Sequence, residues 1–110
     1  MTSKKYLSML GMARRAGKLS MGHDMVQKAI RERKAKLLIF ADGVSDRLVR
    51  EFDVFCDRFN PNLISLTIDE TMDEIHMALG YKAGVITVND ENFSKRIIEL
   101  INQEENANGN

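Results

Sequence analysis

The sequence lacks the features that mark secreted, disulfide-bonded or membrane proteins. Its single cysteine, Cys56, excludes an internal disulfide bond, and the apolar residues around it predict a buried, unreactive thiol. No apolar run approaches the roughly 18 residues that a membrane span requires. The segment MTSKKYLSML has neither a long apolar core nor a small-residue cleavage site, so we do not expect a signal peptide. These absences predict a cytoplasmic protein that does not bind a membrane.

Patterns that carry catalysis or bind metal ions are missing as well. The two histidines, His23 and His76, have no metal-ligand spacing to each other or to the cysteine. The stretch Gly17–Ser20 is similar to the end of a Walker phosphate loop, but Met12 stands where that loop needs its first glycine. The carboxylates within residues 69–74 have the spacing of a solvated helix start, and nothing arranges two of them around a substrate. We therefore expect that the protein is not an enzyme and that it binds neither a cofactor nor a metal ion.

What the sequence does contain is a strong separation of charge. The 16 basic and 16 acidic residues cancel, but ten basic residues and only two acidic ones lie at or before Lys36. The charge of this segment is about +8, and that of the remainder is about −8. Such a segment, centred on Arg14–Lys36, predicts a polyanionic partner. The alternative is a solvated face that only keeps the protein soluble.

Short apolar strands alternate with amphipathic helices along the chain. The expected helices cover residues 2–16, 23–33, 45–58, 67–79 and the segment from 90 onward, and the expected strands cover residues 19–21, 36–41, 63–66 and 84–88. This alternation predicts an α/β fold, a three-layer α-β-α sandwich with a small mixed sheet of about four strands. We expect a single domain over residues 1–104 and a disordered tail over residues 105–110.

The fourth expected helix carries two specific predictions. Thr67 and Glu70 have the spacing of a capping box, which would start the helix at Thr67. Met72 and Met77 then lie within this helix, where we expect them to be part of the buried core.

The basic stretch Arg14–Lys36 contains a glycine turn at the start of a helix. Gly22 permits a tight turn, and the free backbone N–H groups of the helix that follows can bind phosphate. Asp24, Lys28 and Arg31 fall at positions i, i+4 and i+7, which places them on one stripe of that helix. Aromatic residues are missing from this stretch. Their absence favours contacts with the backbone of a structured RNA over stacking on unpaired bases.

Several motifs together resemble the kink-turn-binding ribosomal protein family, and they extend over residues 4–102. The opening Leu10–Leu19, LGMARRAGKL, is similar to the short bacterial YlxQ-type members of that family. The other matching segments are Gly17–Gly22, Lys28–Ile30, Lys34–Ala41, Ile64–Leu66, Glu74, Leu79–Gly80 and Gly84–Val88.

The resemblance implies an α-β-α sandwich that binds structured RNA without catalysis. The expected partner is ribosomal RNA or a kink-turn-like RNA, the expected setting is the ribosome, and the expected state is a monomer. In the family pattern G-x-N-E-x-x-K, Gly22 occupies the position of the glycine and Lys28 that of the lysine. The turn at Gly22 would enter the bend of the RNA. The second RNA-facing element would be the loop Leu79–Gly84, which contains Tyr81 and Lys82.

Three positions depart from the family pattern. Asp24 replaces the family's asparagine, Met25 replaces its glutamate, and Gly43 replaces an acidic loop residue. Neither Asp24 nor Met25 can make the family's contact with a base edge, and losing a bidentate contact costs roughly 1–3 kcal/mol of discrimination. The departures predict RNA binding of looser specificity, carried by basic side chains: Lys18, Lys28, Arg31, Arg33 and Lys34. The alternative is a protein-interaction module of the same fold that has lost specific RNA recognition.

Overall fold

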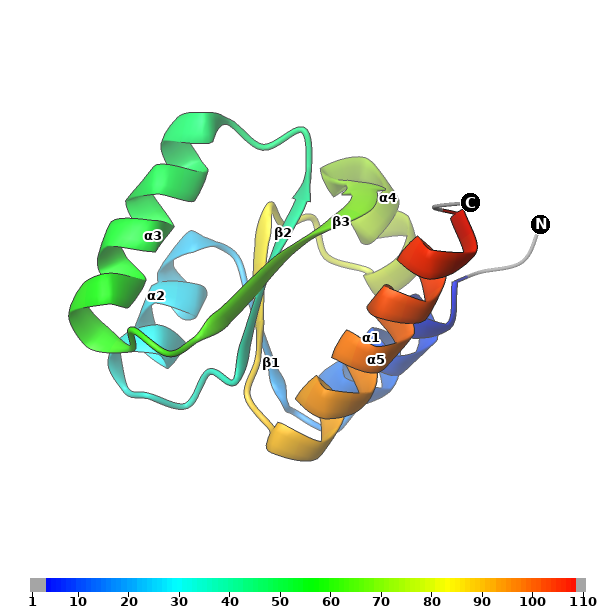
Figure 1. The fold of residues 1–110 in the computed structure, drawn as a ribbon, viewed down its shortest axis with the longest axis horizontal. Coiled ribbons are helices and arrows are strands. Elements are labelled where there is room, and N and C mark those ends of the chain that lie inside the picture. Colours follow the sequence, from blue (N-terminus) through cyan, green and yellow to red (C-terminus); the bar gives the residue numbers. More distant parts are fainter. Residues whose placement is uncertain (1–3, 109–110) are drawn as a thin grey trace.

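The structure, a computed structural model, describes residues 4–108 and arranges them as helices packed against a central sheet (Figure 1). The helices are α1 (Lys5–Arg15), α2 (His23–Arg31), α3 (Asp46–Phe59), α4 (Met72–Leu79) and α5 (Glu91–Asn108). The strands are β1 (Leu19–Met21), β2 (Leu37–Asp42), β3 (Ile64–Thr71) and β4 (Val85–Val88). The order of these elements agrees with the predicted alternation of helices and strands.

The strands form one mixed sheet in the order β1-β4-β2-β3. Strand β2 runs parallel to β3 and antiparallel to β4, and β1 is antiparallel to β4. Leu37 of β2 pairs with Ile64 of β3 on one side and with Val88 of β4 on the other. Two parallel neighbours need a crossover, and α3 supplies it between β2 and β3.

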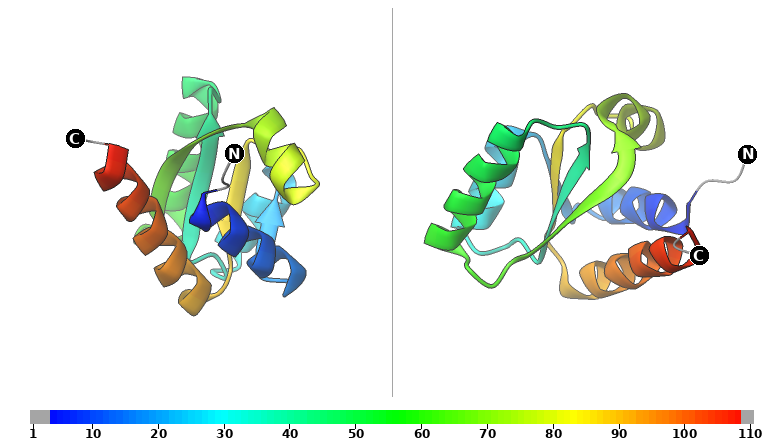
Figure 2. Two further views of the ribbon diagram at one scale, coloured as in Figure 1. Left: turned by 90° about the vertical axis from the view of Figure 1, so that its right-hand side faces the viewer. Right: turned by 45° about the horizontal axis from the view of Figure 1, so that its top comes forward.

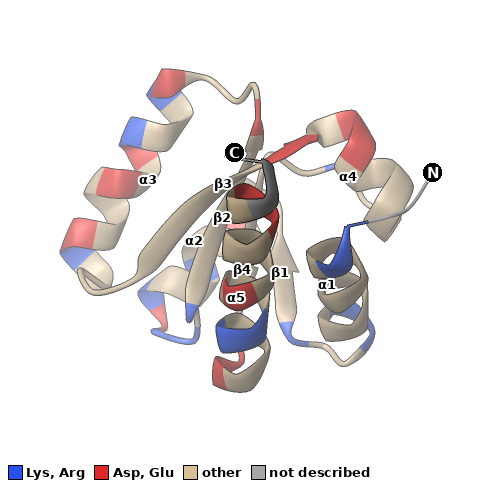
Figure 3. Ribbon diagram, turned by 45° about the vertical axis from the view of Figure 1, so that its right-hand side comes forward, with Lys and Arg blue, Asp and Glu red and all other residues tan. Residues whose placement is uncertain are grey.

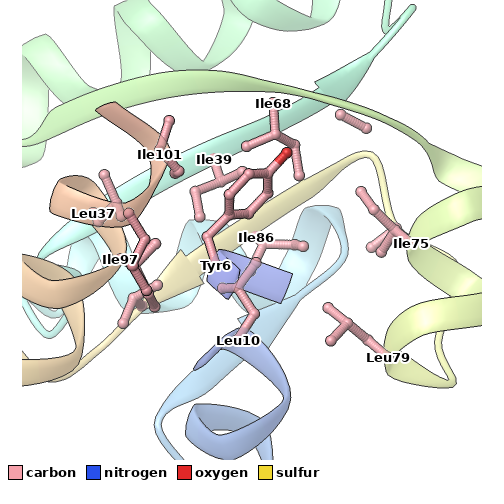
Figure 4. Close-up of a cluster of buried hydrophobic side chains, with 14 residues drawn as sticks. Tyr6, Leu10, Leu37, Ile39, Ile68, Ile75, Leu79, Ile86, Ile97 and Ile101 are labelled. Atoms are coloured by element: carbon pink, nitrogen blue, oxygen red, sulfur yellow. The ribbon is translucent and has the colours of Figure 1, made fainter. Parts of the chain in front are cut away.

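Strand β2 separates two clusters of core residues because its side chains alternate between two covered faces of the sheet. Leu37, Ile39 and Ala41 pack with residues of α1, α4 and α5. Leu38 and Phe40 pack with residues of α2 and α3. Figure 2 shows the two helical layers on opposite faces of the sheet, and Figure 4 shows the first cluster. This arrangement confirms the predicted three-layer sandwich.

The start of α4 differs from the prediction. Strand β3 continues past Thr67 and Glu70 to Thr71, and α4 begins only at Met72. The Thr71 hydroxyl accepts a hydrogen bond of 3.2 Å from the Glu74 N–H, and the Glu74 carboxylate accepts one of 3.0 Å from the Thr71 N–H. The capping box predicted at Thr67 and Glu70 is wrong, because the Thr-x-x-Glu spacing occurs twice and the second pair forms the cap.

Glu70 faces the core instead of belonging to a solvated helix start. Burial alternates at the end of β3, where Ile68 and Glu70 are buried and Asp69 between them is exposed. The Tyr6 hydroxyl donates a hydrogen bond of 2.5 Å to Glu70 Oε1, and Lys4 Nζ lies 3.3 Å from Glu70 Oε2. Burial, together with the hydrogen bond to Glu70, raises the pKa of Tyr6. These contacts join the start of α1 to the end of β3.

The methionines of α4 lie at the surface, which corrects the prediction that they are buried. Met77 is 88% exposed and Met72 is 37% exposed. The helix instead buries Ile75 and Leu79, which are four residues apart and therefore lie on one face. Met77 is two residues from each of them, so its side chain is on the opposite side of the helix.

The last helix also runs further than predicted. Helix α5 continues to Asn108, into the segment expected to form a disordered tail, and residues 109–110 lie outside the described part of the chain. Apolar anchors are absent from this end, but glutamate, glutamine and alanine are good helix formers and extend the helix that Ile97 and Ile101 anchor.

Candidate nucleic-acid interface

Gly22 makes the turn from β1 into α2, and its conformation requires a glycine. Its φ of 93° and ψ of 161° lie in a region that side chains with a Cβ rarely adopt. The Gly22 N–H donates a hydrogen bond of 3.0 Å to the Val85 carbonyl, and the Gly22 carbonyl accepts one of 3.0 Å from the Val26 N–H. Gly22 therefore fixes the start of α2 against the beginning of β4.

The loop between α4 and β4 lies directly beside this turn. A Cβ placed on Gly22 would lie 3.6 Å from the Tyr81 hydroxyl oxygen, and the Tyr81 side chain is about half exposed. Helix α4 ends at Gly80 in the left-handed conformation, with φ of 81°. A Cβ on Gly80 would lie 3.7 Å from Arg14 Nη1 at the end of α1. The start of α2, the end of α1 and the α4–β4 loop thus form one continuous surface.

An open groove of about 490 Å³ runs beside α2. Its walls are the turn before β1, strand β1 itself, one side of α2, the segment between α2 and β2, and Asn89. Four lysines line it: Lys18, Lys28, Lys34 and Lys36. Figure 3 shows basic positions gathered around this end of α1, α2 and β1, whereas α4 and the end of β3 carry acidic positions. We call this feature the lysine groove.

Four of the predicted RNA-binding residues meet in the lysine groove: Lys18, Met25, Lys28 and Lys34. Gly22 and Tyr81 meet beside it, at the α2 start. The Asp24 side chain, in the first turn of α2, is almost fully exposed. Met25 is an exposed apolar side chain. The structure therefore brings most of the predicted residues onto one face, which the charge pattern alone could not establish.

Three other predicted residues do not line the lysine groove. The Arg33 guanidinium donates from Nε to the Phe59 carbonyl at 3.0 Å, which holds it against the end of α3. Lys82 forms an ion pair of 3.0 Å with Asp73 of α4. Arg31 is exposed but does not line the lysine groove.

Helix α2 ends at Arg31, before the predicted limit, because Arg33 takes a left-handed conformation. Its φ is 60°, which is uncommon for a residue other than glycine. The N–H groups of Arg33 and Lys34 donate to the carbonyls of Ile30 and Ala29 at 3.0 and 2.9 Å. This is the hydrogen-bond pattern of a Schellman motif. It turns the chain away from the helix axis, and Lys34 lines the lysine groove.

His23 is the site residue that sequence reasoning does not identify. It is the first residue of α2, and its Nε2 lies 2.6 Å from Oε2 of Glu51 on α3. The hydrogen bond to Glu51 raises the pKa of His23, while partial burial opposes the shift. The pair is separated by 28 residues in the sequence, so no local spacing signals it.

Within residues 4–108, no group of three or more histidine, cysteine or acidic side chains could hold a metal ion. None of the helices in this range is long and apolar enough to cross a membrane. Cys56 is half-buried, and burial, with the nearby Asp53 and Asp57 carboxylates, raises the pKa of its thiol. A raised thiol pKa means less of the reactive thiolate at neutral pH.

These features define a small α-β-α sandwich with a glycine turn, an exposed loop and a lysine groove on one face. The model of the Ribosomal protein L7Ae/L30e/S12e/Gadd45 family matches residues 4–98, and the chain belongs to this family. The RNA-binding protein YlxQ of Bacillus subtilis (strain 168) is 26% identical over 102 residues, which cover 92% of this chain and 99% of that protein. The match confirms the resemblance to YlxQ-type members.

Solved structures share the fold. A protein of unknown function from Bacillus halodurans C superposes with a TM-score of 0.78 at 27% identity, covering 91% of this chain and 99% of that one. The Giardia lamblia 15.5kD RNA binding protein superposes with a TM-score of 0.69 at 13% identity, covering 94% of this chain and 90% of that one. At this lower identity the second likeness supports the fold alone.

Proposed function

We propose that this protein binds structured RNA, without catalysis, through the face formed by the Gly22 turn, the α4–β4 loop and the lysine groove. The observation that carries the proposal is the position of the Tyr81 side chain, where it would meet a Cβ on Gly22 at 3.6 Å, beside the four lysines of the groove. The RNA-binding description of the YlxQ relative supports the same conclusion. The RNA we expect is ribosomal or kink-turn-like, in the cytoplasm and bound by a monomer.

The start of α2 can hold a phosphate group through its backbone. Gly22 has no side chain to cap the helix, so the N–H groups of the first turn remain available to an oxygen acceptor. The positive end of the helix dipole favours the negative charge there, and Lys28 one turn further on adds a full positive charge. A phosphate at this turn would therefore meet both donors and charge.

The reading of bases is the weaker part of the proposed site. Asp24 and Met25 occupy the positions from which the family's asparagine and glutamate contact base edges. A carboxylate at position 24 repels nearby phosphate, and a thioether at position 25 is at most a weak acceptor. We expect measurable RNA affinity with a small preference for a kink-turn over other structured RNA.

A salt-titrated binding assay tests this proposal. A kink-turn RNA and its unkinked control are each titrated with wild-type protein, Lys28→Ala and Lys95→Ala, the last being a matched control because Lys95 is an exposed lysine on α5. Affinity should fall steeply with salt, and Lys28→Ala should weaken binding and reduce the salt slope by about 1, whereas Lys95→Ala should do neither. If wild type binds neither a kink-turn nor a generic hairpin at low salt, the proposal is wrong.

A protein-interaction module is the second candidate, and the surface of α4 favours it. Met77 is 88% exposed, and Met72 and Tyr81 are exposed near it in the sequence. Exposed methionines of this kind occur on surfaces that bind other proteins. This candidate predicts no RNA binding together with a defined protein partner that is still recovered after nuclease treatment and is lost on Met77→Ala.

A further inference from the structure

We propose that the far end of the lysine groove, around Glu32, Lys34 and Lys36, is a second contact that holds the phosphate backbone of a helical stem of the same RNA. This inference rests on the proposed RNA binding and extends it away from the Gly22 turn. Lys36 and Glu32 are not part of the family pattern described above. They belong to the site because the groove extends past the end of α2 to the segment that leads into β2.

The charge of the groove fits a phosphate backbone. Its lining includes four lysines, and among the described residues that line it Glu32 is the one acidic side chain. Lys18, Lys28, Lys34 and Lys36 come from three separate segments: the turn before β1, helix α2 and the connection to β2. Four exposed lysines that line one groove create a local positive potential, which attracts an anionic partner.

The shape of the groove favours an extended ligand over a small one. It is partly open to solvent, and its lining combines four lysines with the apolar residues Leu19 and Ala29. An enclosed pocket with convergent polar groups would suit a small molecule, whereas an open basic track suits a polymer of phosphates.

The attraction of cations to the C-terminal end of α2 does not by itself explain why both Lys34 and Lys36 line the groove. The C-terminal end of a helix attracts cations, and Lys34 lies just beyond the end of α2, where this attraction acts. Lys36 lies further along, just before β2, and its N–H donates a hydrogen bond of 2.8 Å to the carbonyl of Val88 at the end of β4. Its side chain nevertheless lines the same groove.

Glu32 offers a way to test the site by strengthening it. The Glu32 carboxylate forms an exposed ion pair of 3.2 Å with Lys34 and so occupies one of the four lysines. A phosphate must compete with this carboxylate for Lys34. Glu32→Gln removes the competitor and one negative charge, so RNA binding should become tighter. The matched control is Glu99→Gln on α5, where Glu99 forms an exposed ion pair of 3.8 Å with Arg96.

The experiment measures the affinity of the full chain for a kink-turn RNA with two long stems, and for the same RNA with either stem shortened. Lys36→Ala should weaken binding to the long RNA about tenfold near 0.1 M salt and reduce the salt slope by about 1. Glu32→Gln should tighten it about threefold to tenfold. Shortening one of the two stems should abolish both effects, while Lys95→Ala and Glu99→Gln should change nothing. Thermal melts of each variant check that all four substitutions leave the fold intact.

The outcomes separate this inference from the proposed function. If wild type binds the RNA and Lys28→Ala weakens it, but Lys36→Ala and Glu32→Gln behave like their α5 controls, the groove contact is refuted while RNA binding at Gly22 stands. If Lys36→Ala and Glu32→Gln have the same effects on both of the RNAs with one shortened stem, the stem contact is also refuted. If wild type binds no RNA, both proposals are refuted.

Discussion

The imidazole of His23, at the start of α2, is joined to the Glu51 carboxylate of α3 by a hydrogen bond of 2.6 Å between Nε2 and Oε2. The same ring packs edge-on against Phe52, with ring centroids 5.2 Å apart. Gln27, one turn further along α2, donates a longer hydrogen bond of 3.5 Å to Glu51. The two helices that cover one face of the sheet are thus joined at the residue that follows the Gly22 turn.

This pair predicts a pH-dependent contribution to stability. The folded-state pKa of His23 is raised above its unfolded value of about 6.5, so the stabilisation is fully present below that pH and is lost as pH rises through the folded pKa. Because both side chains are nearly half exposed, solvent screening limits the contribution to about 0.5–1 kcal/mol. Urea unfolding of wild type and His23→Gln should differ by this amount near pH 6 and converge near pH 9.

His76→Gln is the control for this measurement, because it removes the other histidine from an exposed position on α4. Glu51→Gln should remove most of the pH-dependent difference that His23→Gln removes, because Glu51 raises the pKa of His23 most and the Asp24 carboxylate, 3.4 Å from Nδ1, raises it further. A difference between wild type and His23→Gln that is the same at both pH values would show that the imidazole acts by packing on Phe52 and not by its charge.

The layers of the fold could be predicted from the sequence because burial patterns fix them. The continuous apolar run of β2 indicated a strand covered on both faces, and its residues do divide between two clusters. The boundary between β3 and α4 could not be predicted, because Thr67 and Thr71 each precede a glutamate by three residues. What decides between them is the contact of Glu70 with Tyr6, which lies 64 residues earlier in the chain.

The candidate site was predictable to a smaller extent. The glycine turn and the stripe that contains Lys28 follow from local spacing, and the structure places Lys28 in the lysine groove and the Gly22 turn beside it, but leaves Arg31 of the same stripe outside the groove. The positions of Arg33 and Lys36 depend on how the chain leaves α2. Arg33 takes a left-handed conformation and bonds to α3, whereas Lys36 joins the groove. Neither outcome is encoded in the charge pattern.

The cap of α4 provides a second prediction. Thr71→Ala removes the hydroxyl that accepts from the Glu74 N–H, so the free energy of unfolding should fall by about 0.5–2 kcal/mol. Thr67→Ala, at an exposed position of β3, should cost less than about 0.5 kcal/mol. Urea unfolding compares the two, and amide exchange at Glu74 should accelerate only in Thr71→Ala. A larger loss of unfolding free energy in Thr67→Ala than in Thr71→Ala would indicate that α4 starts at Thr67.

A third prediction concerns Gly22, with Gly11 as its matched control. Gly22→Ala forces a Cβ onto a backbone with φ of 93°, which should destabilise the protein by about 1–3 kcal/mol. Gly11 lies within α1, where a Cβ would meet its nearest neighbour at 3.5 Å, an ordinary contact. Gly11→Ala should therefore stabilise the protein by about 0.5–1 kcal/mol. Urea unfolding measures the change in the free energy of unfolding for each variant. Changes of the same sign in both variants would contradict the conclusion that the Gly22 turn requires a glycine.

The fourth prediction tests why specificity should be loose. The double variant Asp24→Asn, Met25→Glu restores the family's two base-reading residues at the start of α2, where both side chains are exposed. The ratio of its Kd for the unkinked control to its Kd for the kink-turn RNA measures the preference. This ratio should increase by a factor that corresponds to roughly 1–3 kcal/mol of binding free energy. Asp24→Asn alone removes one negative charge and restores only one of the two base-reading residues, so it should tighten both RNAs and raise the preference for the kink-turn by less than the double variant does. Met25→Glu adds a carboxylate to the lysine groove, so the double variant should bind a generic hairpin no more tightly than wild type does. An unchanged Kd ratio in the double variant would show that positions 24 and 25 do not limit recognition in this chain.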